Sequence, residues 1–239
     1  MRPARRGNSK GREHENRCRQ PSFIESVGAA VPAFAAGDEV FAFRDVRMGC
    51  HAEYVTMPAA AAIARRPRNL SFEECAALSF GGTTALAFLR RARIQRGESV
   101  LIVGASGCVG TAAVQLARHF GAHVTGVCSS GNAALVESVG ADAIIAYDKH
   151  DFSTTGARYD IIMDTTGTVS FARARECLDR GGRFLAVAAS LPDMLQIQRA
   201  ALLTSARVIA GPTTGSSADL RLLAALAEAG EFRPVIDRC

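Results

Sequence analysis

Three closely spaced glycines after an apolar, β-branched run are the residues of this chain best suited to chemistry. The segment reads Val100-Leu-Ile-Val-Gly-Ala-Ser-Gly-Cys-Val-Gly110, and an apolar pattern of helical period follows it. Gly107 carries no Cβ that would hold an anion away from the backbone, and Gly110 allows a helix to lie close to the strand before it. The first turn of such a helix presents unpaired N–H groups and a positive dipole end. The spacing therefore predicts a loop whose backbone binds the pyrophosphate of a dinucleotide.

The loop departs from the usual glycine pattern at its first position, which is occupied by Ala105 after Gly104. Because glycine triplets also occur in ordinary turns, the elements around this loop must support the prediction. Strand-like runs occur at Ser99–Val103, His123–Val127, Ala143–Ala146, Asp160–Met163, Arg183–Val187 and Arg207–Ala210. Helical patterns occur at Thr111–Phe120, Asn132–Val139, Val169–Leu178 and Ala218–Ala229. Their alternation predicts an α/β fold with a Rossmann-type doubly wound parallel sheet.

The end of the second predicted strand bears on which dinucleotide binds. A carboxylate about 20 residues after the glycines would accept the ribose 2′-hydroxyl of NAD. The chain instead reads Val127-Cys-Ser-Ser-Gly-Asn132, where Ser129 and Ser130 offer hydroxyl donors and no carboxylate would repel a 2′-phosphate. We therefore expect NADPH to be favoured over NADH, although this loop holds no Lys or Arg.

Further motifs follow one another in order along the chain. They are Gly37-Asp-Glu-Val-Phe41, Ala52-Glu-Tyr-Val55, Leu78-Ser-Phe-Gly-Gly-Thr-Thr-Ala-Leu86, the segment 97–110, Tyr159-Asp-Ile-Ile-Met-Asp-Thr-Thr-Gly167 and Pro234-Val-Ile-Asp-Arg238. Through them the chain resembles the medium-chain dehydrogenase/reductase superfamily, in its zinc-independent, quinone oxidoreductase-like branch. The resemblance implies a nucleotide-binding domain inserted into a GroES-like, β-rich catalytic domain. It divides the chain into a disordered basic tail over 1–22, an incomplete GroES-like domain over 23–70 and a Rossmann domain over 71–239.

The resemblance also implies cofactor contacts at individual positions. The pyrophosphate loop would consist of Ala105, Ser106, Gly107, Cys108, Val109 and Gly110, and Tyr147 would join Ser129 and Ser130 at the 2′-phosphate. Thr84 would lie beside the nicotinamide, and Thr165 would lie under the nicotinamide-side ribose. The implied reaction is hydride transfer from NADPH to a quinone, enone or related carbonyl compound. Such acceptors are electron-poor and require no dedicated acid, so no catalytic residue is named.

No metal is expected in this chain. A zinc site needs converging Cys, His and carboxylate ligands, and a structural one needs closely spaced cysteines. The seven cysteines form no C-x-x-C pair, and Cys50 and His51 would point to opposite faces of a strand.

The net charge of +5 lies entirely in the first 20 residues, which hold seven Lys or Arg and two Glu. Because this segment has almost no apolar residues, a solvated, unstructured tail is favoured over one that binds nucleic acid. The odd number of scattered cysteines, the lack of a secretory signal and the lack of an apolar run of about 18 residues favour a cytoplasmic protein that crosses no membrane.

Local patterns add predictions about single residues. Ser71 and Glu74 have the spacing of a capping box, so a helix should begin there. The alanine-rich stretch 59–69 is a candidate hinge. Tyr54 is expected to pack on a strand rather than to donate a proton. Asp164 is expected to close a turn.

The sequence is compatible with three functions. The first is the NADPH-dependent reductase, which pairs as a homodimer in many members of the superfamily. The second is a catalytically weak or inactive nucleotide-binding protein, because the front and closing segments of the catalytic domain do not appear in the resemblance. The third is a structural or RNA-associated role. Cys108 could have a redox function, but we favour the interpretation that it is a small apolar residue.

Overall fold

The protein is described by a computed structural model that covers residues 19–44, 49–50, 52–189 and 206–237. The predicted basic tail lies outside these residues except for its last few, which belong to the first strand. In chain order the elements are β1 (Arg19–Phe23), β2 (Glu39–Phe43), β3 (Ala62–Arg65), α1 (Phe72–Ala92), β4 (Ser99–Val103), α2 (Cys108–His119), β5 (His123–Cys128), η2 (Ser130–Asn132), α3 (Ala133–Ser138), β6 (Ala143–Ala146), η3 (Phe152–Thr154), β7 (Tyr159–Asp164), α4 (Phe171–Glu176), β8 (Leu178–Ala186), β9 (Arg207–Ala210) and α6 (Ser217–Glu228).

Six strands form one sheet in the order β6-β5-β4-β7-β8-β9, and all of their pairings are parallel. This order arises when two β-α-β-α-β halves meet between their first strands, here β4 and β7. The predicted doubly wound parallel sheet is confirmed, and each predicted strand overlaps an observed one. A ligand of such a sheet lies outside the carboxyl ends of the strands at the point where the order reverses. The carboxyl ends of β4 and β7 therefore mark where a nucleotide would bind.

Alternating side chains bury the sheet on both faces. In β4, Val100 and Ile102 belong to the core shared with α1, α2 and α6, whereas Leu101 and Val103 belong to the core under α4. Successive residues of a strand point to opposite faces, so a continuous apolar run is what a strand covered on both sides requires.

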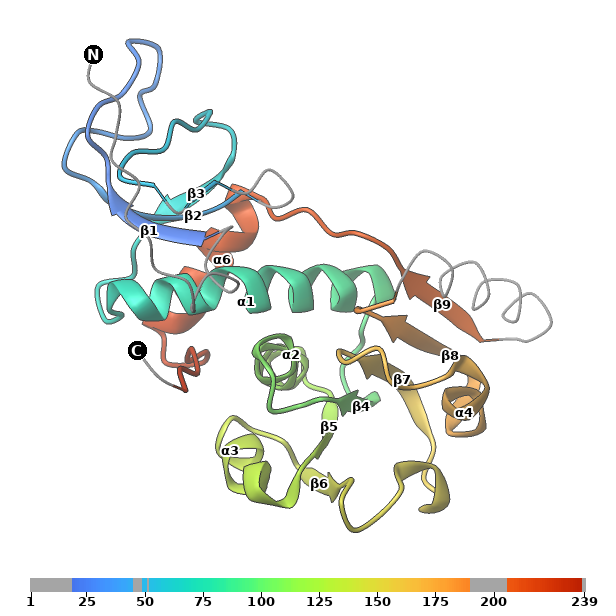
Figure 1. The fold of residues 1–239 in the computed structure, drawn as a ribbon. Helices are drawn as coiled ribbons and strands as arrows, with labels where there is room; N and C mark the ends of the chain where they lie inside the picture. Colours follow the sequence, from blue (N-terminus) through green and yellow to red (C-terminus); the bar gives the residue numbers. More distant parts are fainter. Residues whose placement is uncertain (1–18, 45–48, 51, 190–205, 238–239) are drawn as a thin grey trace.

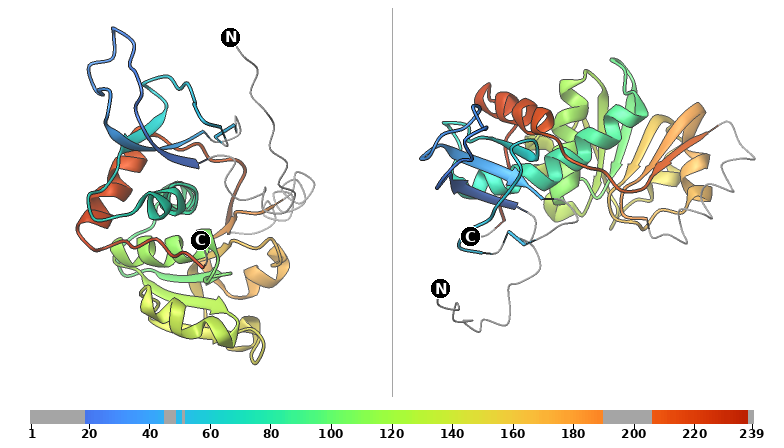
Figure 2. Two further views of the ribbon diagram at one scale, coloured as in Figure 1. Left: turned by 60° about the vertical axis from the view of Figure 1, so that its left-hand side comes forward. Right: turned by 90° about the horizontal axis from the view of Figure 1, so that it is seen from above.

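A second, antiparallel sheet in the order β1-β2-β3 lies across α1 from the large sheet (Figure 1, Figure 2). Helix α1 contacts β1 and β2 on one side and α2 on the other. After β9 the chain returns to the small sheet, where α6 packs against β3. Ser217 Oγ donates to the Ala61 carbonyl at 2.7 Å, and Asn69 Nδ2 donates to the Ala227 carbonyl at 2.8 Å. The two sheets are thus held together by α1 and α6.

The start of α1 confirms the predicted capping box. The Glu74 N–H donates to Ser71 Oγ at 3.2 Å, and the Ser71 N–H donates to Glu74 Oε2 at 2.7 Å. The stretch 59–69, expected to act as a hinge, instead contains β3. Arg66 fastens it, because its guanidinium forms an ion pair with Glu39 and lies 4.9 Å from the centre of the Phe72 ring.

Two other expectations differ from the structure. Tyr54 does not pack on a strand: it lies in the connection between β2 and β3, and its side chain is 74% exposed. Strand β8 begins at Leu178 rather than at Arg183, because Leu178 already pairs with Tyr159 before the register shifts. Gly181, with φ +80°, lies within this irregular stretch. Within the described ranges, no helix has the length and apolarity needed to cross a membrane.

Candidate nucleotide-binding site

The glycine-rich loop joins the end of β4 to the start of α2, at the reversal point of the sheet. The N–H groups of Gly104 and Ala105 each donate to the Val127 carbonyl at 3.0 Å, which fastens the loop to β5. A Cβ on Gly110 would lie 2.0 Å from the Gly104 carbonyl oxygen and 2.8 Å from the Ala105 backbone. Only glycine therefore lets α2 begin this close to β4.

Helix α2 begins without a side-chain cap. Ser71 and Ser216 cap α1 and α6 through capping boxes, whereas Gly107 offers the first turn of α2 no side-chain acceptor. Gly107 and Cys108 are exposed, and a Cβ on Gly107 would meet only the Gly104 carbonyl oxygen, at 3.4 Å. The N–H groups of this turn are therefore open to an anion, as in known phosphate sites. The loop fits the pyrophosphate of a nicotinamide dinucleotide.

The turn after β5 and the segment after β6 meet beside this loop. The Tyr147 N–H donates to the Cys128 carbonyl at 3.0 Å, and Asn132 Nδ2 donates to Ser106 Oγ at 3.1 Å. These bonds bring Ser129, at the start of the turn, and the exposed Tyr147 to the same edge of the sheet as the glycine loop.

A carboxylate also lies at this edge: the segment 127–132 holds none, but Asp148 from another segment lies beside Ser130. The Ser130 N–H donates to Asp148 Oδ1 at 2.8 Å, and Ser130 Oγ donates to Asp148 Oδ2 at 2.5 Å. These two hydrogen bonds lower the pKa of Asp148 below its usual value, and the bond from the Ser130 hydroxyl has the larger effect. Asp148 follows β6, the third strand of the sheet along the chain, whereas the sequence argument about a carboxylate concerns only the residues after the second strand, β5.

The loop after β7 forms the other side of the site. Thr165 Oγ1 donates to the Val103 carbonyl at 2.8 Å, so this hydroxyl fixes the end of β4. A Cβ on Gly104 would lie 2.4 Å from Thr166 Cγ2 and 2.6 Å from Thr165 Oγ1. The two strand ends therefore approach each other at a distance that only glycine permits.

Asp164 shapes that loop from within. It is 2% exposed, and its Oδ1 accepts from the Thr166 N–H at 2.9 Å, the Thr166 hydroxyl at 2.7 Å and the Gly167 N–H at 3.1 Å. Its Oδ2 accepts from the Val169 N–H at 2.9 Å. The prediction that Asp164 closes a turn is confirmed.

Helix α1 supplies Thr84, one turn after Gly81 and on the same side of the helix. A Cβ on Gly81 would lie 2.3 Å from the Cys108 carbonyl oxygen, so α1 presses directly on the start of α2. Thr84 is 7% exposed, and no described residue forms a hydrogen bond with its hydroxyl. Thr84 is therefore a largely buried residue one turn along α1 from the contact of Gly81 with the glycine loop.

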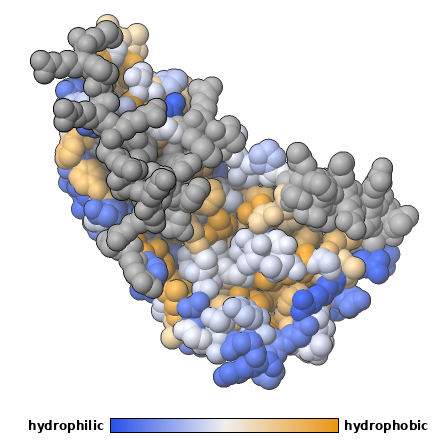
Figure 3. Space-filling model, in the orientation of Figure 1, coloured by the Kyte–Doolittle hydropathy of each residue, from blue (hydrophilic) through white to orange (hydrophobic). Residues whose placement is uncertain are grey.

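The predicted site residues therefore fall into two groups. Ser106, Gly107, Cys108, Ser129, Ser130, Tyr147 and Thr165 lie at the carboxyl edge of the sheet, while Ala105, Val109, Gly110 and Thr84 are buried behind the loop. Figure 3 shows hydrophobic surface over the middle of this face of the molecule and hydrophilic surface along its lower rim.

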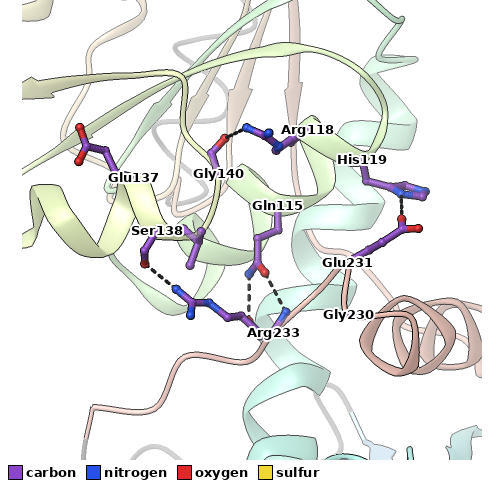
Figure 4. Close-up of a pocket in the computed structure, with 10 residues that line it drawn as sticks. Gln115, Arg118, His119, Glu137, Ser138, Gly140, Gly230, Glu231 and Arg233 are labelled. Carbon is purple, nitrogen blue, oxygen red and sulfur yellow. Dashed lines mark hydrogen bonds and ion pairs between the residues drawn. The ribbon is translucent and has the colours of Figure 1, made fainter.

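A cavity of about 580 Å³ lies elsewhere, at the other end of α2 (Figure 4). Gln115 connects α2 to the segment after α6. Its Oε1 accepts from the Arg233 N–H at 2.8 Å, and its Nε2 donates to the Arg233 carbonyl at 3.0 Å. His119 pairs with Glu231 at 2.8 Å, and the Arg233 guanidinium donates to Ser138 Oγ at 2.5 Å. Helix α2 rises about 1.5 Å per residue, which puts Gln115 about 10 Å along the axis from the glycine loop. These contacts join α2, α3 and the chain end, and they are separate from the nucleotide-binding edge.

The described residues do not fit a zinc site. In this part of the chain, no three His, Cys, Asp or Glu side chains lie together as metal ligands. His51 falls outside the described residues, so the geometry of the pair Cys50-His51 is not defined.

Thiol labelling is expected to separate the cysteines by environment. Burial raises the pKa of Cys75 to about 12 and also raises the pKa values of Cys128 and Cys177. Cys108 is exposed on the glycine loop. Because thiolates are the reactive form, a thiol reagent near pH 8 should modify Cys108 well before these three, and NADPH should slow that reaction. Timed labelling with peptide mass spectrometry measures both effects, and equal rates with and without NADPH would contradict a cofactor at this loop.

Comparisons with known proteins agree with this geometry. The sequence profile of the family described as zinc-binding dehydrogenase matches residues 108–229. A quinone oxidoreductase of Sus scrofa is 33% identical over 227 residues, which cover 89% of this chain and 68% of the relative. An NADPH-dependent alkenal/one oxidoreductase of Arabidopsis thaliana, described as chloroplastic, is 29% identical over 223 residues, which cover 90% of this chain and 54% of the relative.

A solved structure also resembles this chain. The quinone oxidoreductase of Coxiella burnetii superposes with a TM-score of 0.83 at 26% identity, covering 92% of this chain and 70% of that one. The chain spans 54% of the length of the Arabidopsis relative and 68% of the length of the Sus scrofa relative. With the parallel sheet and the uncapped glycine loop, these matches show that the chain belongs to the zinc-binding dehydrogenase family of the medium-chain dehydrogenase/reductase superfamily and resembles its quinone oxidoreductases.

Proposed function

We propose that this chain belongs to an NADPH-dependent oxidoreductase that transfers hydride to a quinone, an enone or a related carbonyl compound without zinc. The observation that carries the proposal is the uncapped start of α2, which faces the reversal point of the sheet through Gly107. Relatives named for quinone and alkenal reduction support the reaction class.

We assign cofactor binding to the residues at this edge and behind it. The α2 N–H groups over residues 108–110 would hold the pyrophosphate, while Ser129, Ser130 and Tyr147 would face the adenine-side ribose. Thr165 would fix the loop under the nicotinamide-side ribose, and the unpartnered Thr84 hydroxyl would lie towards the nicotinamide. The Ser129 hydroxyl and the NADPH named in the Arabidopsis relative support NADPH over NADH.

When bound, the reduced nicotinamide supplies the hydride. The described residues hold and orient it, and packing of α1 on α2 through Gly81 excludes water from the base of the loop. No side chain is assigned as a proton donor. The division of the chain near residue 70 is part of the proposal, and it is supported by the end of β3 at Arg65 and the start of α1 at Phe72.

We also propose a cytoplasmic location, a homodimer and a small-molecule substrate. The five described cysteines are all free thiols, which suits a reducing compartment. Strand β9 is an edge of the large sheet, and a second copy would cover it. Microscopy of a tagged protein and light scattering of the purified one test the location and the assembly.

A titration followed by turnover tests the function. We expect the purified protein to enhance the fluorescence of NADPH on binding, and then to oxidise it when a simple quinone or an enone is added. Metal analysis of the active sample should find less than about one zinc per ten chains. Binding without oxidation would instead favour a nucleotide-binding protein without turnover, and absence of NADPH binding would refute the proposed cofactor site.

A further inference from the structure

We propose that Asp148 sets how strongly this protein discriminates between NADPH and NADH, by withholding Ser130 from the 2′-phosphate. The inference rests on the proposed function, because it assumes that a nicotinamide dinucleotide binds at this edge. The wider expectation from the sequence is a preference for NADPH. Asp148 opposes that preference.

Two segments define where the adenine-side ribose would lie. In a doubly wound sheet the residues after the second strand recognise the 2′-position of that ribose. Here that strand is β5, and its following turn begins at Ser129. The Asn132 amide ties this turn to Ser106 on the pyrophosphate loop at 3.1 Å. The turn therefore stands next to the pyrophosphate loop, where a ribose must follow.

Asp148 occupies both donors of Ser130 in that turn. Its two carboxylate oxygens take both the N–H and the hydroxyl of Ser130, at 2.8 and 2.5 Å. A 2′-phosphate would need the same donors, so it would have to displace Asp148 and would meet its negative charge. The positive charge of the neighbouring Lys149 contributes least among the causes that lower the pKa of Asp148.

The ribose of NADH imposes no such conflict. A carboxylate has about four lone-pair sites, and the Ser130 bonds use two of them. Asp148 is exposed, so its remaining sites can accept a ribose hydroxyl while the Ser130 bonds persist. The same residue thus penalises the phosphate and tolerates the hydroxyl.

The test compares binding of the two cofactors to the whole chain. For Asp148→Asn we expect the Kd of NADPH to fall about tenfold, because the charge repulsion is removed, while the Kd of NADH changes by less than about twofold. Adenosine 2′,5′-bisphosphate, used as a competitor that lacks the nicotinamide, should bind more tightly by the same factor. Asp148→Ser provides a second variant that keeps a hydroxyl and removes the charge. Adding Ser130→Ala to Asp148→Asn should reverse part of the gain.

Asp142→Asn is the matched control, because it removes one carboxylate charge at the opposite end of β6. Asp142 accepts from the Val124 N–H at 2.7 Å and has no contact with the Ser130 turn. Both Kd values should stay within about twofold of the wild type. If the wild type binds both cofactors but their Kd ratio is unchanged in both Asp148 variants, the inference about Asp148 is overturned and the proposed function stands. If the wild type binds neither, the proposed function itself fails.

Discussion

Gly110→Ala is expected to abolish binding of NADPH and NADH, with Kd values raised at least about 100-fold. The new Cβ would lie 2.0 Å from the Gly104 carbonyl oxygen and 2.8 Å from Ala105, so the start of α2 must move away from β4. The atoms it meets belong to the backbone and cannot turn aside as a flexible side chain could. Since Ala favours a helix interior more than Gly does, local helix stability cannot explain a loss.

A fluorescence titration measures this effect, and thermal unfolding shows whether the variant remains folded. Gly28→Ala is the control, since its Cβ would meet only Val31, at 4.0 Å. We expect that control to bind as the wild type does. Wild-type affinity in a folded Gly110→Ala variant would mean that the cofactor does not depend on the approach of α2 to β4.

Asp164→Ala is expected to lower the free energy of unfolding by about 3 to 4 kcal/mol and to weaken cofactor binding as well. The buried carboxylate accepts four hydrogen bonds, from Thr166, Gly167 and Val169, and its removal breaks all four and leaves the N–H of the buried Val169 without this acceptor. The loop they form meets Gly104 at the reversal point of the sheet. Loss of its shape should therefore reach the cofactor site.

Urea unfolding followed by circular dichroism gives the stability change, and the NADPH titration gives the change in affinity. Asp179→Ala is the matched control, because Asp179 is 46% exposed and has one ion pair, with Arg158 at 3.5 Å. Loss of this ion pair should lower the free energy of unfolding by about 0.5 kcal/mol or less. Equal destabilisation by the two substitutions would show that the Asp164 hydrogen bonds contribute no more than a surface charge does.

The doubly wound parallel sheet could be predicted from the sequence because the signals of its strands and helices are local. Apolar runs alternate with helical patterns, and the glycines mark the turn where β4 meets α2. Right-handed crossovers leave few arrangements for such a series of strands and helices. The capping box at Ser71 and the turn at Asp164 were likewise predictable, since each depends on residues within a few positions of one another.

Local signals were less informative outside the large sheet. The alanine-rich stretch 59–69 was expected to be a hinge, yet part of it becomes β3 by pairing with β2. Small residues carry little propensity of their own, so a partner strand decides their conformation. Tyr54 was expected on a strand because aromatic residues favour strands, yet in the described part of the chain it belongs to none.

The sequence by itself determined the fold class, the position of the pyrophosphate loop and the family, because these depend on residue types at short, fixed spacing. Only the tertiary structure decided what surrounds that loop. Asp148 reaches Ser130 because parallel strands end at one edge of the sheet, and Gly81 meets Cys108 because α1 crosses the start of α2. Such contacts join residues that are far apart in the chain, and their geometry is set by packing, which no local pattern encodes.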